Sequence, residues 1–193
     1  MTGRIPAFES IHDAYRPRIR RYLGRMVGEA EAEDLTQQVM LKVNANLPRF
    51  RGEADLSTWI YRIATNTALD QLRRRRTREE PPPAGMAAPR ADDQDEAWAE
   101  ASAPSAEAGA IREEMNQCVR DFVDRLPDGY KSVIALSELE GFTNSEIAAI
   151  LGISIDTVKI RLHRARERLR KDLASGCSFH RDDRNEFACE RKP

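Results

Sequence analysis

The chain has 193 residues, of which 33% are charged and 40% hydrophobic, and its formal net charge is −1. This composition is too polar for an integral membrane protein. The longest uncharged apolar stretch, residues 147–155, falls well short of the roughly 20 residues that cross a bilayer. Few aromatic and glycine residues, together with abundant Ala, Leu, Glu and Arg, favour helices and predict an all-α fold.

The cysteines and the first residues bear on the location of the chain. Three unevenly spaced cysteines, Cys118, Cys177 and Cys189, do not make a disulfide framework and fit a reducing compartment. The N-terminus runs directly into an amphipathic segment with no apolar signal region. We therefore expect a cytoplasmic protein with no direct membrane insertion.

Charge is distributed unevenly and divides the chain into segments. Residues 1–78 carry a net charge of +6, residues 79–110 carry −7, and residues 111–193 are neutral. The acidic segment is rich in proline and alanine and has no apolar periodicity, so it cannot bury enough surface to fold. We predict a flexible acidic linker at 79–110 between two small helical domains.

The first domain is predicted to contain three amphipathic helices around one core. The first covers residues 7–27, where Pro17 predicts a break or kink near Tyr15. The second covers residues 30–47, and the third begins near residue 56 and ends in the arginine run 73–76. The second helix has apolar residues at four-residue steps, namely Leu35, Val39, Val43 and Leu47.

The second domain is predicted to contain four helices, over residues 110–126, 128–139, 144–151 and from about 155 to 173. Thr143 and Glu146 have the spacing of a capping box at the start of the third of these helices. Gly152 can turn the chain into the last helix, so the pair has a helix-turn-helix pattern. The same pattern also fits an ordinary helical hairpin.

The last helix favours DNA binding over a plain hairpin. Residues 157–171 contain seven Lys or Arg residues and one Glu, a net charge of +6, which suits phosphates better than a solvated surface. The N-terminal part of such a helix meets base edges, and cations further along contact phosphates. The predicted DNA contacts of this domain are Thr143, Asn144, Ser154, Thr157, Lys159, Arg161, Arg164 and Arg168.

Three segments carry a resemblance to a known family. Residues 32–43, which read AEDLTQQVMLKV, and residues 57–74, which begin STWIYRIATNTALD, resemble region 2 of the bacterial sigma-70 family. Residues 141–148, which read GFTNSEIA, resemble part of region 4. With region 2 at residues 7–78 and region 4 at 111–173, only the acidic linker stands where region 3 would be. That organisation is typical of the extracytoplasmic-function (ECF) sigma factors.

The resemblance implies roles for exposed residues of the first domain. It implies that a surface of the second helix docks on the β′ clamp helices of core RNA polymerase, through Asp34, Gln37, Gln38, Leu41 and Lys42. It implies that the third helix opens the −10 promoter element, with candidate contacts Arg62, Asn66, Asp70, Arg73, Arg74, Arg75 and Arg76. Trp59 is assigned to the core because it shares an apolar stripe with Ile63.

The resemblance also implies partners and a function. Region 4 would read the −35 element and contact the β flap of the polymerase, and an anti-sigma factor would hold the protein inactive. No catalytic constellation or phosphate-binding loop is apparent, so the chain is predicted to be no enzyme. The alternative is a stand-alone helix-turn-helix transcriptional regulator that acts on duplex DNA without a polymerase requirement.

The C-terminal tail, residues 174–193, departs from a minimal two-domain sigma factor. Cys177-x-x-His180 has metal-ligand spacing, and Cys189 adds a third soft ligand, so a Zn²⁺ site completed by a further ligand is one hypothesis. A reversible disulfide between the two cysteines is another, and an inert tail is the third. No other cofactor is expected.

Overall fold

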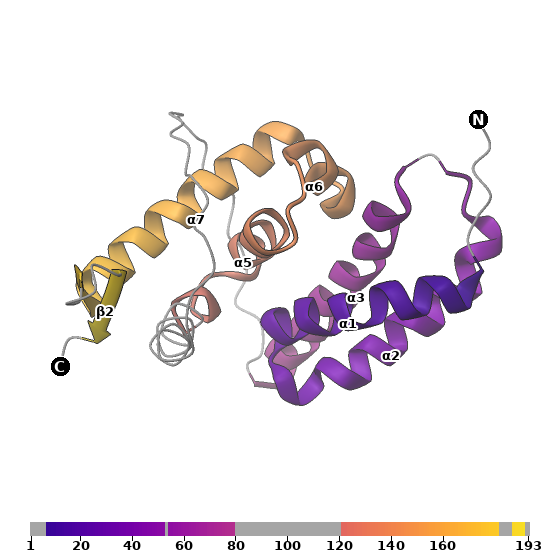
Figure 1. Ribbon diagram of the computed structural model, residues 1–193, viewed down its shortest axis with the longest axis horizontal. Coiled ribbons are helices and arrows are strands. Elements are labelled where there is room, and N and C mark those ends of the chain that lie inside the picture. The colour runs from indigo at the N-terminus through magenta and orange to yellow at the C-terminus, as the bar shows by residue number, and fades with distance from the viewer. Residues whose placement is uncertain (1–6, 53, 80–120, 182–186, 192–193) are drawn as a thin grey trace.

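The computed structural model describes residues 7–52, 54–79, 121–181 and 187–191. Two groups of helices lie side by side, with α1, α2 and α3 in one group and α5, α6 and α7 in the other (Figure 1). Both domains are helical, which confirms the all-α prediction. No helix in the described ranges is long and apolar enough to span a membrane.

Helix α1 spans Phe8–Val27 and continues through Pro17. Of the two predicted alternatives, a break or a kink near Tyr15, the break is therefore wrong. A proline inside a helix costs about 3 kcal/mol. Large side chains on both sides of the proline are buried in the same core, namely Ile11, Ile19, Tyr22 and Leu23. Burial of each contributes about 1.5–3 kcal/mol, which outweighs the proline penalty.

Helix α2 spans Glu29–Asn46, and a short 3₁₀ turn, η1, follows at Leu47–Arg49. The predicted apolar row lies on the buried side of the helix, where Leu35, Val39 and Val43 are in the core. The remaining members of the buried face include Ala32 and Met40. The opposite face of α2 is therefore left exposed along most of its length.

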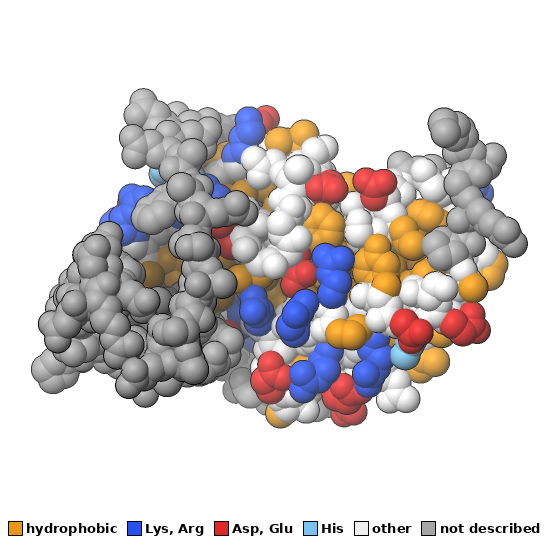
Figure 2. Space-filling view, viewed as in Figure 1, with side chains coloured by type: hydrophobic (Ala, Val, Ile, Leu, Met, Phe, Trp, Pro, Cys, Tyr) orange, Lys and Arg blue, Asp and Glu red, His pale blue; other side chains and the backbone are white. Residues whose placement is uncertain are grey.

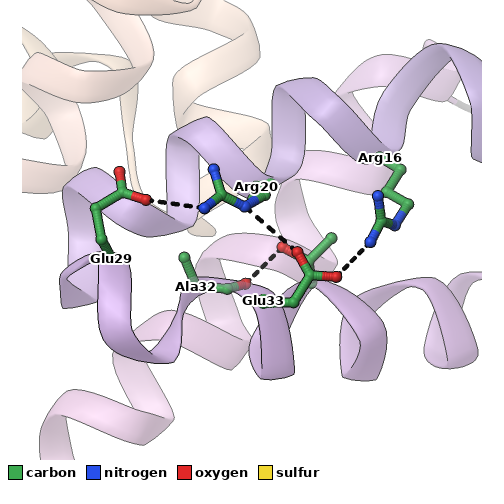
Figure 3. A network of polar contacts seen from close by, with 6 residues as sticks. Arg16, Arg20, Glu29, Ala32 and Glu33 are labelled. Atoms are coloured by element: carbon green, nitrogen blue, oxygen red, sulfur yellow. Dashed lines mark hydrogen bonds and ion pairs between the residues drawn. The ribbon is translucent and has the colours of Figure 1, made fainter.

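Exposed ion pairs join α1 to the first turns of α2 (Figure 3). Arg20 lies 3.3 Å from carboxylate oxygens of both Glu29 and Glu33, and Arg16 pairs with Glu33 as well. Basic and acidic side chains alternate on this face of the molecule (Figure 2). Single exposed pairs stabilise little, so the buried side chains that α1 and α2 share in the core contribute more than this network to holding the two helices together.

Helix α3 spans Leu56–Glu79 and includes the whole arginine run. The prediction that the helix ends there is therefore wrong. Gln71 Nε2 and Arg75 Nε donate hydrogen bonds to the carboxylate of Glu31 on α2, at 2.9 and 3.0 Å. These contacts from a second helix hold the basic end of α3 in place, and arginine is itself a good helix former.

A buried polar contact ties α1 to α3 within the first core. The hydroxyl of Tyr22 lies 2.8 Å from the hydroxyl of Thr65, and both residues are fully buried. The Tyr22 ring packs edge-on against Tyr61, with 5.4 Å between ring centroids. Burial raises the pKa of the Tyr22 phenol above its ordinary value, so the group stays neutral and hydrogen-bonded.

The second domain contains α5 (Asp128–Ile134), α6 (Asn144–Leu151) and α7 (Ile155–Gly176). The predicted helix at 128–139 corresponds to α5 followed by a π-helical turn, η2, at Ala135–Leu139. Residues 121–124 are helical and residues 125–126 form a turn, so the predicted helix at 110–126 ends two residues early. Its residues before 121 lie outside the described residues, as does most of the predicted linker.

The two domains meet where α3 packs against α6 (Figure 1). The rings of Tyr61 and Phe142 pack edge to face with 4.8 Å between centroids. The Tyr61 hydroxyl donates to Glu140, and Arg18 lies 3.9 Å from the same carboxylate, whose side chain is only 7% exposed. Burial and the Glu140 carboxylate raise the pKa of Tyr61. The resemblance gave no indication of this contact.

The tail forms a two-stranded antiparallel hairpin after α7, which was not predicted. Strand β1 spans Cys177–Arg181 and β2 spans Phe187–Arg191. In this register Cys177 pairs with Arg191, and Phe179 pairs with Cys189. The hairpin begins directly at the end of the basic helix, so the tail is continuous with α7.

Candidate nucleic-acid interface

Helices α6 and α7 form a helix-turn-helix unit, as predicted. Gly152 has a φ of 66° and is left-handed, a conformation that glycine adopts at low cost. The amide of Ile153 donates to the carbonyl of Ala148 at 3.2 Å and closes the turn. Ala148 is 8% exposed, and α7 buries Val158 and Leu162. The other face of α7 therefore remains available to DNA.

The predicted capping box is present at the start of α6. The amide of Glu146 donates to Thr143 Oγ1 at 3.4 Å, and the amide of Thr143 donates to the Glu146 carboxylate at 2.8 Å. The Thr143 hydroxyl and amide lower the pKa of Glu146. The Thr143 hydroxyl also donates to that carboxylate at 2.7 Å, so the assignment of this hydroxyl to a phosphate competes with the cap.

Replacement of Glu146 with glutamine tests the cap through its pH dependence. The folded pKa of Glu146 lies below its unfolded value, so its stabilisation is present above the ordinary pKa of about 4.3 and is lost as the pH falls through the lowered value. We expect a loss of about 0.5 kcal/mol at neutral pH, because the glutamine amide can still accept from Thr143 and only the charge at the helix N-terminus is removed. Thermal unfolding of both proteins across a pH series would measure it, and a difference that persists unchanged at about pH 3 would contradict the capping role.

The predicted −35 contacts lie on the accessible side of the helix-turn-helix unit. All are exposed or half-exposed, namely Thr143, Asn144, Ser154, Thr157, Lys159, Arg161, Arg164 and Arg168. The Ser154 hydroxyl caps α7 by accepting from the amide of Thr157 at 3.1 Å. Ser154 and Thr143 therefore serve the helix starts in this structure, while the cations extend along α7.

Several cations of α7 have exposed acidic neighbours. Arg166 lies 2.8 Å from Glu138, and Lys171 lies 2.9 Å from Glu167 on the same helix. Exposed pairs of this kind are worth about 0–1 kcal/mol. DNA phosphates can therefore displace these carboxylates at little cost, and the pairs do not prevent the basic face from binding a polyanion.

The predicted polymerase surface occupies the exposed face of α2. Asp34, Gln37 and Gln38 are exposed, and Leu41 is 63% exposed, the highest value among the large hydrophobic side chains described as exposed. These residues follow one another at helical spacing on one side of α2. Lys42 differs, because its Nζ donates to Thr67 on α3 at 2.9 Å. Its ammonium group therefore lies toward α3 in this structure.

An open cavity of about 370 Å³ lies where the end of α2, the turn η1 and helix α3 meet. It contains two of the predicted −10 contacts, Arg62 and Asn66, and four further residues. The complete lining is Asn46, Arg49, Trp59, Arg62, Ile63 and Asn66. Its volume is at the low end of the range of small-molecule sites.

Sequence reasoning missed Asn46 and Arg49, which come from the end of α2 and from η1. No local signal marks them, because their position depends on how η1 folds back beside α3. Trp59 was predicted to belong to the core. In the structure it packs against other hydrophobic side chains and also lines the cavity. Its indole packs against Phe50 at 5.1 Å between centroids, is half-buried, and lines the cavity.

The remaining −10 candidates divide into two groups. Asp70, Arg73 and Arg74 border a second open depression of about 390 Å³ further along α3. Arg75 instead pairs with Glu31 on α2, and Arg76 lies 2.8 Å from Asp128 of the second domain. The structure therefore brings part of the predicted set together and directs the last two arginines elsewhere.

The three hypotheses for the C-terminal tail, a Zn²⁺ site, a reversible disulfide or an inert segment, stay predictions. Cys177 is buried at the start of β1. The side chains of His180 and Cys189 lie outside the described residues. Within the described part of the chain no cluster of three metal-binding side chains occurs.

A helix-turn-helix with a basic helix, joined to a domain with a base-sized cavity, defines a two-domain DNA-binding protein. Residues 11–78 match the family description Sigma-70 region 2, and residues 116–169 match Sigma-70 region 4. The ECF RNA polymerase sigma factor SigW of Bacillus subtilis is 33% identical over 177 residues, which covers 89% of this chain and 91% of SigW. The chain therefore belongs to the sigma-70 family and is similar to its ECF members.

A further relative agrees with this assignment, and a solved structure shares the fold. The ECF RNA polymerase sigma-E factor of Escherichia coli K12 is 32% identical over 165 residues, which covers 86% of this chain and 85% of that protein. The sigma factor RpoE of Bartonella quintana, solved with the anti-sigma factor NepR, shares the fold with a TM-score of 0.63 at 24% identity. That match covers 86% of this chain and 96% of RpoE.

Proposed function

We propose that the chain binds core RNA polymerase and directs it to promoters, opening the −10 element with the first domain and reading the −35 element with the second. This proposal rests mainly on the structure of the first domain. It combines an exposed polar face on α2 with a base-sized, cationic cavity beside α3. The polymerase catalyses phosphodiester bond formation, because sigma factors are transcription initiation factors and not enzymes.

The first domain acts on a melted strand. One base leaves the stack and enters the cavity, where Trp59 and Ile63 offer apolar surface and Asn66 offers a polar edge. Arg62 at the cavity, with Arg73 and Arg74 further along α3, supplies positive charge for the strand backbone. The energy of strand contacts then offsets the cost of unstacking the base.

The second domain acts on duplex DNA. Helix α7 enters the major groove, with Lys159 and Arg161 near its N-terminus in reach of base edges. Arg164 and Arg168 lie further along the helix and contact phosphates. This division predicts that the first pair determines which sequence is preferred and the second pair determines how strongly DNA of any sequence is bound.

The proposed location and partners follow from this function. The chain works in the cytoplasm, where core polymerase and promoters are found. An anti-sigma factor is expected to control it, by analogy with RpoE of Bartonella quintana, whose structure was solved with such a partner. The alternative, a stand-alone regulator, is less favoured because it gives no role to the α2 face or to the cavity.

Gel filtration with bacterial core RNA polymerase tests the proposal. The double variant Asp34→Ala/Gln37→Ala is expected to lose at least tenfold in affinity, and with it co-migration, because both exposed side chains lie on the proposed contact face. Ser10→Ala/Asp13→Ala removes one exposed carboxylate and one exposed polar group from α1, away from that face, and should co-migrate like wild type. Wild-type protein that never joins core polymerase would support the stand-alone regulator.

A further inference from the structure

His163 is an exposed ionisable residue of α7 that the predicted DNA contacts do not include. The buried side of the helix is formed by Val158, Leu162 and Ala165. Lys159 lies four residues before His163, so the two side chains follow one another along the exposed side. The formal charge of the helix omits His163, because histidine is counted as neutral at pH 7. His163 therefore lies on the face that the proposed function assigns to DNA.

The position of His163 along α7 favours a phosphate over a base as its ligand. It is the ninth residue of the helix, about 12 Å from the start at 1.5 Å per residue. The first turns of such a helix meet base edges, and cations further along meet phosphates. His163 comes after the proposed base contacts Lys159 and Arg161 and directly before Arg164, a proposed phosphate contact. A backbone phosphate is therefore the group that the ring is placed to meet.

One acidic residue lies near His163 on α7, and it is engaged by another cation. Glu167 is four residues further along and is the only acid in residues 157–171. Its carboxylate lies 2.9 Å from Lys171 Nζ. The hydrogen bond and the charge of Lys171 lower the pKa of Glu167, and the charge of His163 adds to this effect. Glu167 therefore stays ionised at about pH 5–8, so it is not the source of a change in DNA affinity over that range.

No other element engages the His163 ring among the described residues. Helices α5 and α6 pack against α7, and η2 reaches it through one ion pair. Strand β1 begins only at Cys177, about 21 Å further along. The charged side chains of α5, α6 and η2 contact other groups, namely Glu138 with Arg166, Lys131 with Asp124, Asp128 with Arg76 and Glu146 with Thr143. The charged groups nearest the ring in sequence are those of α7 itself, namely Lys159, Arg164, Arg166 and Glu167.

We propose that His163 binds a backbone phosphate of promoter DNA in its protonated form, with the proton taken from solvent. Histidine is the side chain that ordinarily changes charge between pH 5 and 8. The protonated ring donates from both nitrogens and forms a charge-assisted hydrogen bond with a phosphate oxygen, whereas the neutral ring makes a weaker contact. Because bound DNA favours the charged ring, a lower pH favours bound DNA by the same factor. This inference rests on the proposed function and adds control of promoter affinity by pH.

The pH dependence of promoter binding tests the inference. Holoenzymes are reconstituted from bacterial core RNA polymerase with wild type or His163→Gln, whose side chain is polar and is not protonated in this range. Affinity is measured for a duplex that the wild-type holoenzyme selects from a randomised pool. The affinity of wild type relative to His163→Gln is expected to be about tenfold higher at about pH 5.5 than at about pH 8. Taking this ratio cancels the pH dependence of the polymerase itself.

Salt dependence and matched variants separate a phosphate contact from other roles. The slope of log affinity against log salt concentration should be steeper by about 0.9 at the lower pH for wild type, and equal at both pH values for His163→Gln. His163→Lys carries a permanent charge and should bind at both pH values about as tightly as wild type does at the lower one. His12→Gln makes the glutamine change on α1, where the side chain is 40% exposed, and should behave as wild type.

Each other outcome has a definite meaning. If the ratio of wild type to His163→Gln is the same at both pH values, His163 takes up no proton on binding and the inference is wrong. If His163→Gln alters the selected sequence and leaves the salt slope of wild type intact, the ring reads a base and the phosphate contact is excluded. A wild-type holoenzyme that selects no duplex at either pH would instead overturn the proposed function, and the inference with it.

Discussion

Replacing Arg164 and Arg168 with alanine is expected to weaken promoter binding by the reconstituted holoenzyme about 30-fold at physiological salt, without changing the preferred sequence. Both residues lie on the accessible face of α7, beyond the segment predicted to meet base edges. Each phosphate contact releases counterions and contributes about 0.9 to the slope of log affinity against log salt concentration. The slope should therefore fall by about 2 in the double variant.

The contrast with the N-terminal end of α7 makes this test specific. Lys159→Ala/Arg161→Ala removes the same charge but should alter the selected −35 sequence, because these side chains are placed to meet base edges. Arg21→Ala combined with Arg51→Ala removes equal charge from the first domain and serves as the control for net charge. If the salt slope of Arg164→Ala/Arg168→Ala equals that of wild type, these two arginines of α7 do not contact DNA phosphates.

Local sequence patterns predicted the parts of this protein that depend on local chemistry. The four-residue apolar row of α2 and the Thr143 to Glu146 capping box lie within a few turns of helix, so their spacing alone determines the outcome. The exposed face with Asp34 and Leu41 follows from the same periodicity. Sequence therefore located the helices, the helix-turn-helix unit and most of the accessible faces.

The features that sequence missed depend on residues that are far apart in the chain. Helix α3 continues through its arginines because Glu31, on another helix, accepts from Arg75. The cavity arises where η1 brings Arg49 beside α3. Pro48 in this turn marks the end of α2 but does not determine where the chain goes next. Helix α1 continues through Pro17 for a related reason, since the core on both sides of the proline outweighs its local penalty. The energy of such contacts between distant elements cannot be predicted until the packing of those elements is known.

The contact between the two domains has a consequence for promoter binding. The −35 and −10 elements are centred about 25 base pairs apart, which is about 85 Å along duplex DNA at 3.4 Å per base pair. Helix α3, with its 24 residues, is about 36 Å long, and α6 packs directly against it. The packed arrangement therefore cannot serve both elements at once, and the contact of Tyr61 with Phe142 and Glu140 has to open on the promoter.

Glu140→Lys is expected to open this contact in the free protein. The Glu140 side chain is 7% exposed and lies between the Tyr61 hydroxyl and Arg18, so a lysine there would place two cations together at a buried site. Arg18 is 43% exposed, so the main loss is the hydrogen bond from Tyr61 to a carboxylate, about 2 kcal/mol, which shifts the ratio of closed to open molecules by about 30-fold. Small-angle X-ray scattering should record a larger radius of gyration for the variant.

Glu138→Lys provides the matched control, because it makes the same charge change two residues earlier at an exposed position. Its radius of gyration should stay at the wild-type value. Circular dichroism of both variants should show wild-type helix content, because α3 and α6 each keep the packing within their own domain. If Glu140→Lys is as compact as wild type, the Tyr61 to Glu140 contact does not hold the domains together. If it opens, core polymerase should bind it faster than wild type, since the cost of separating the domains has already been removed.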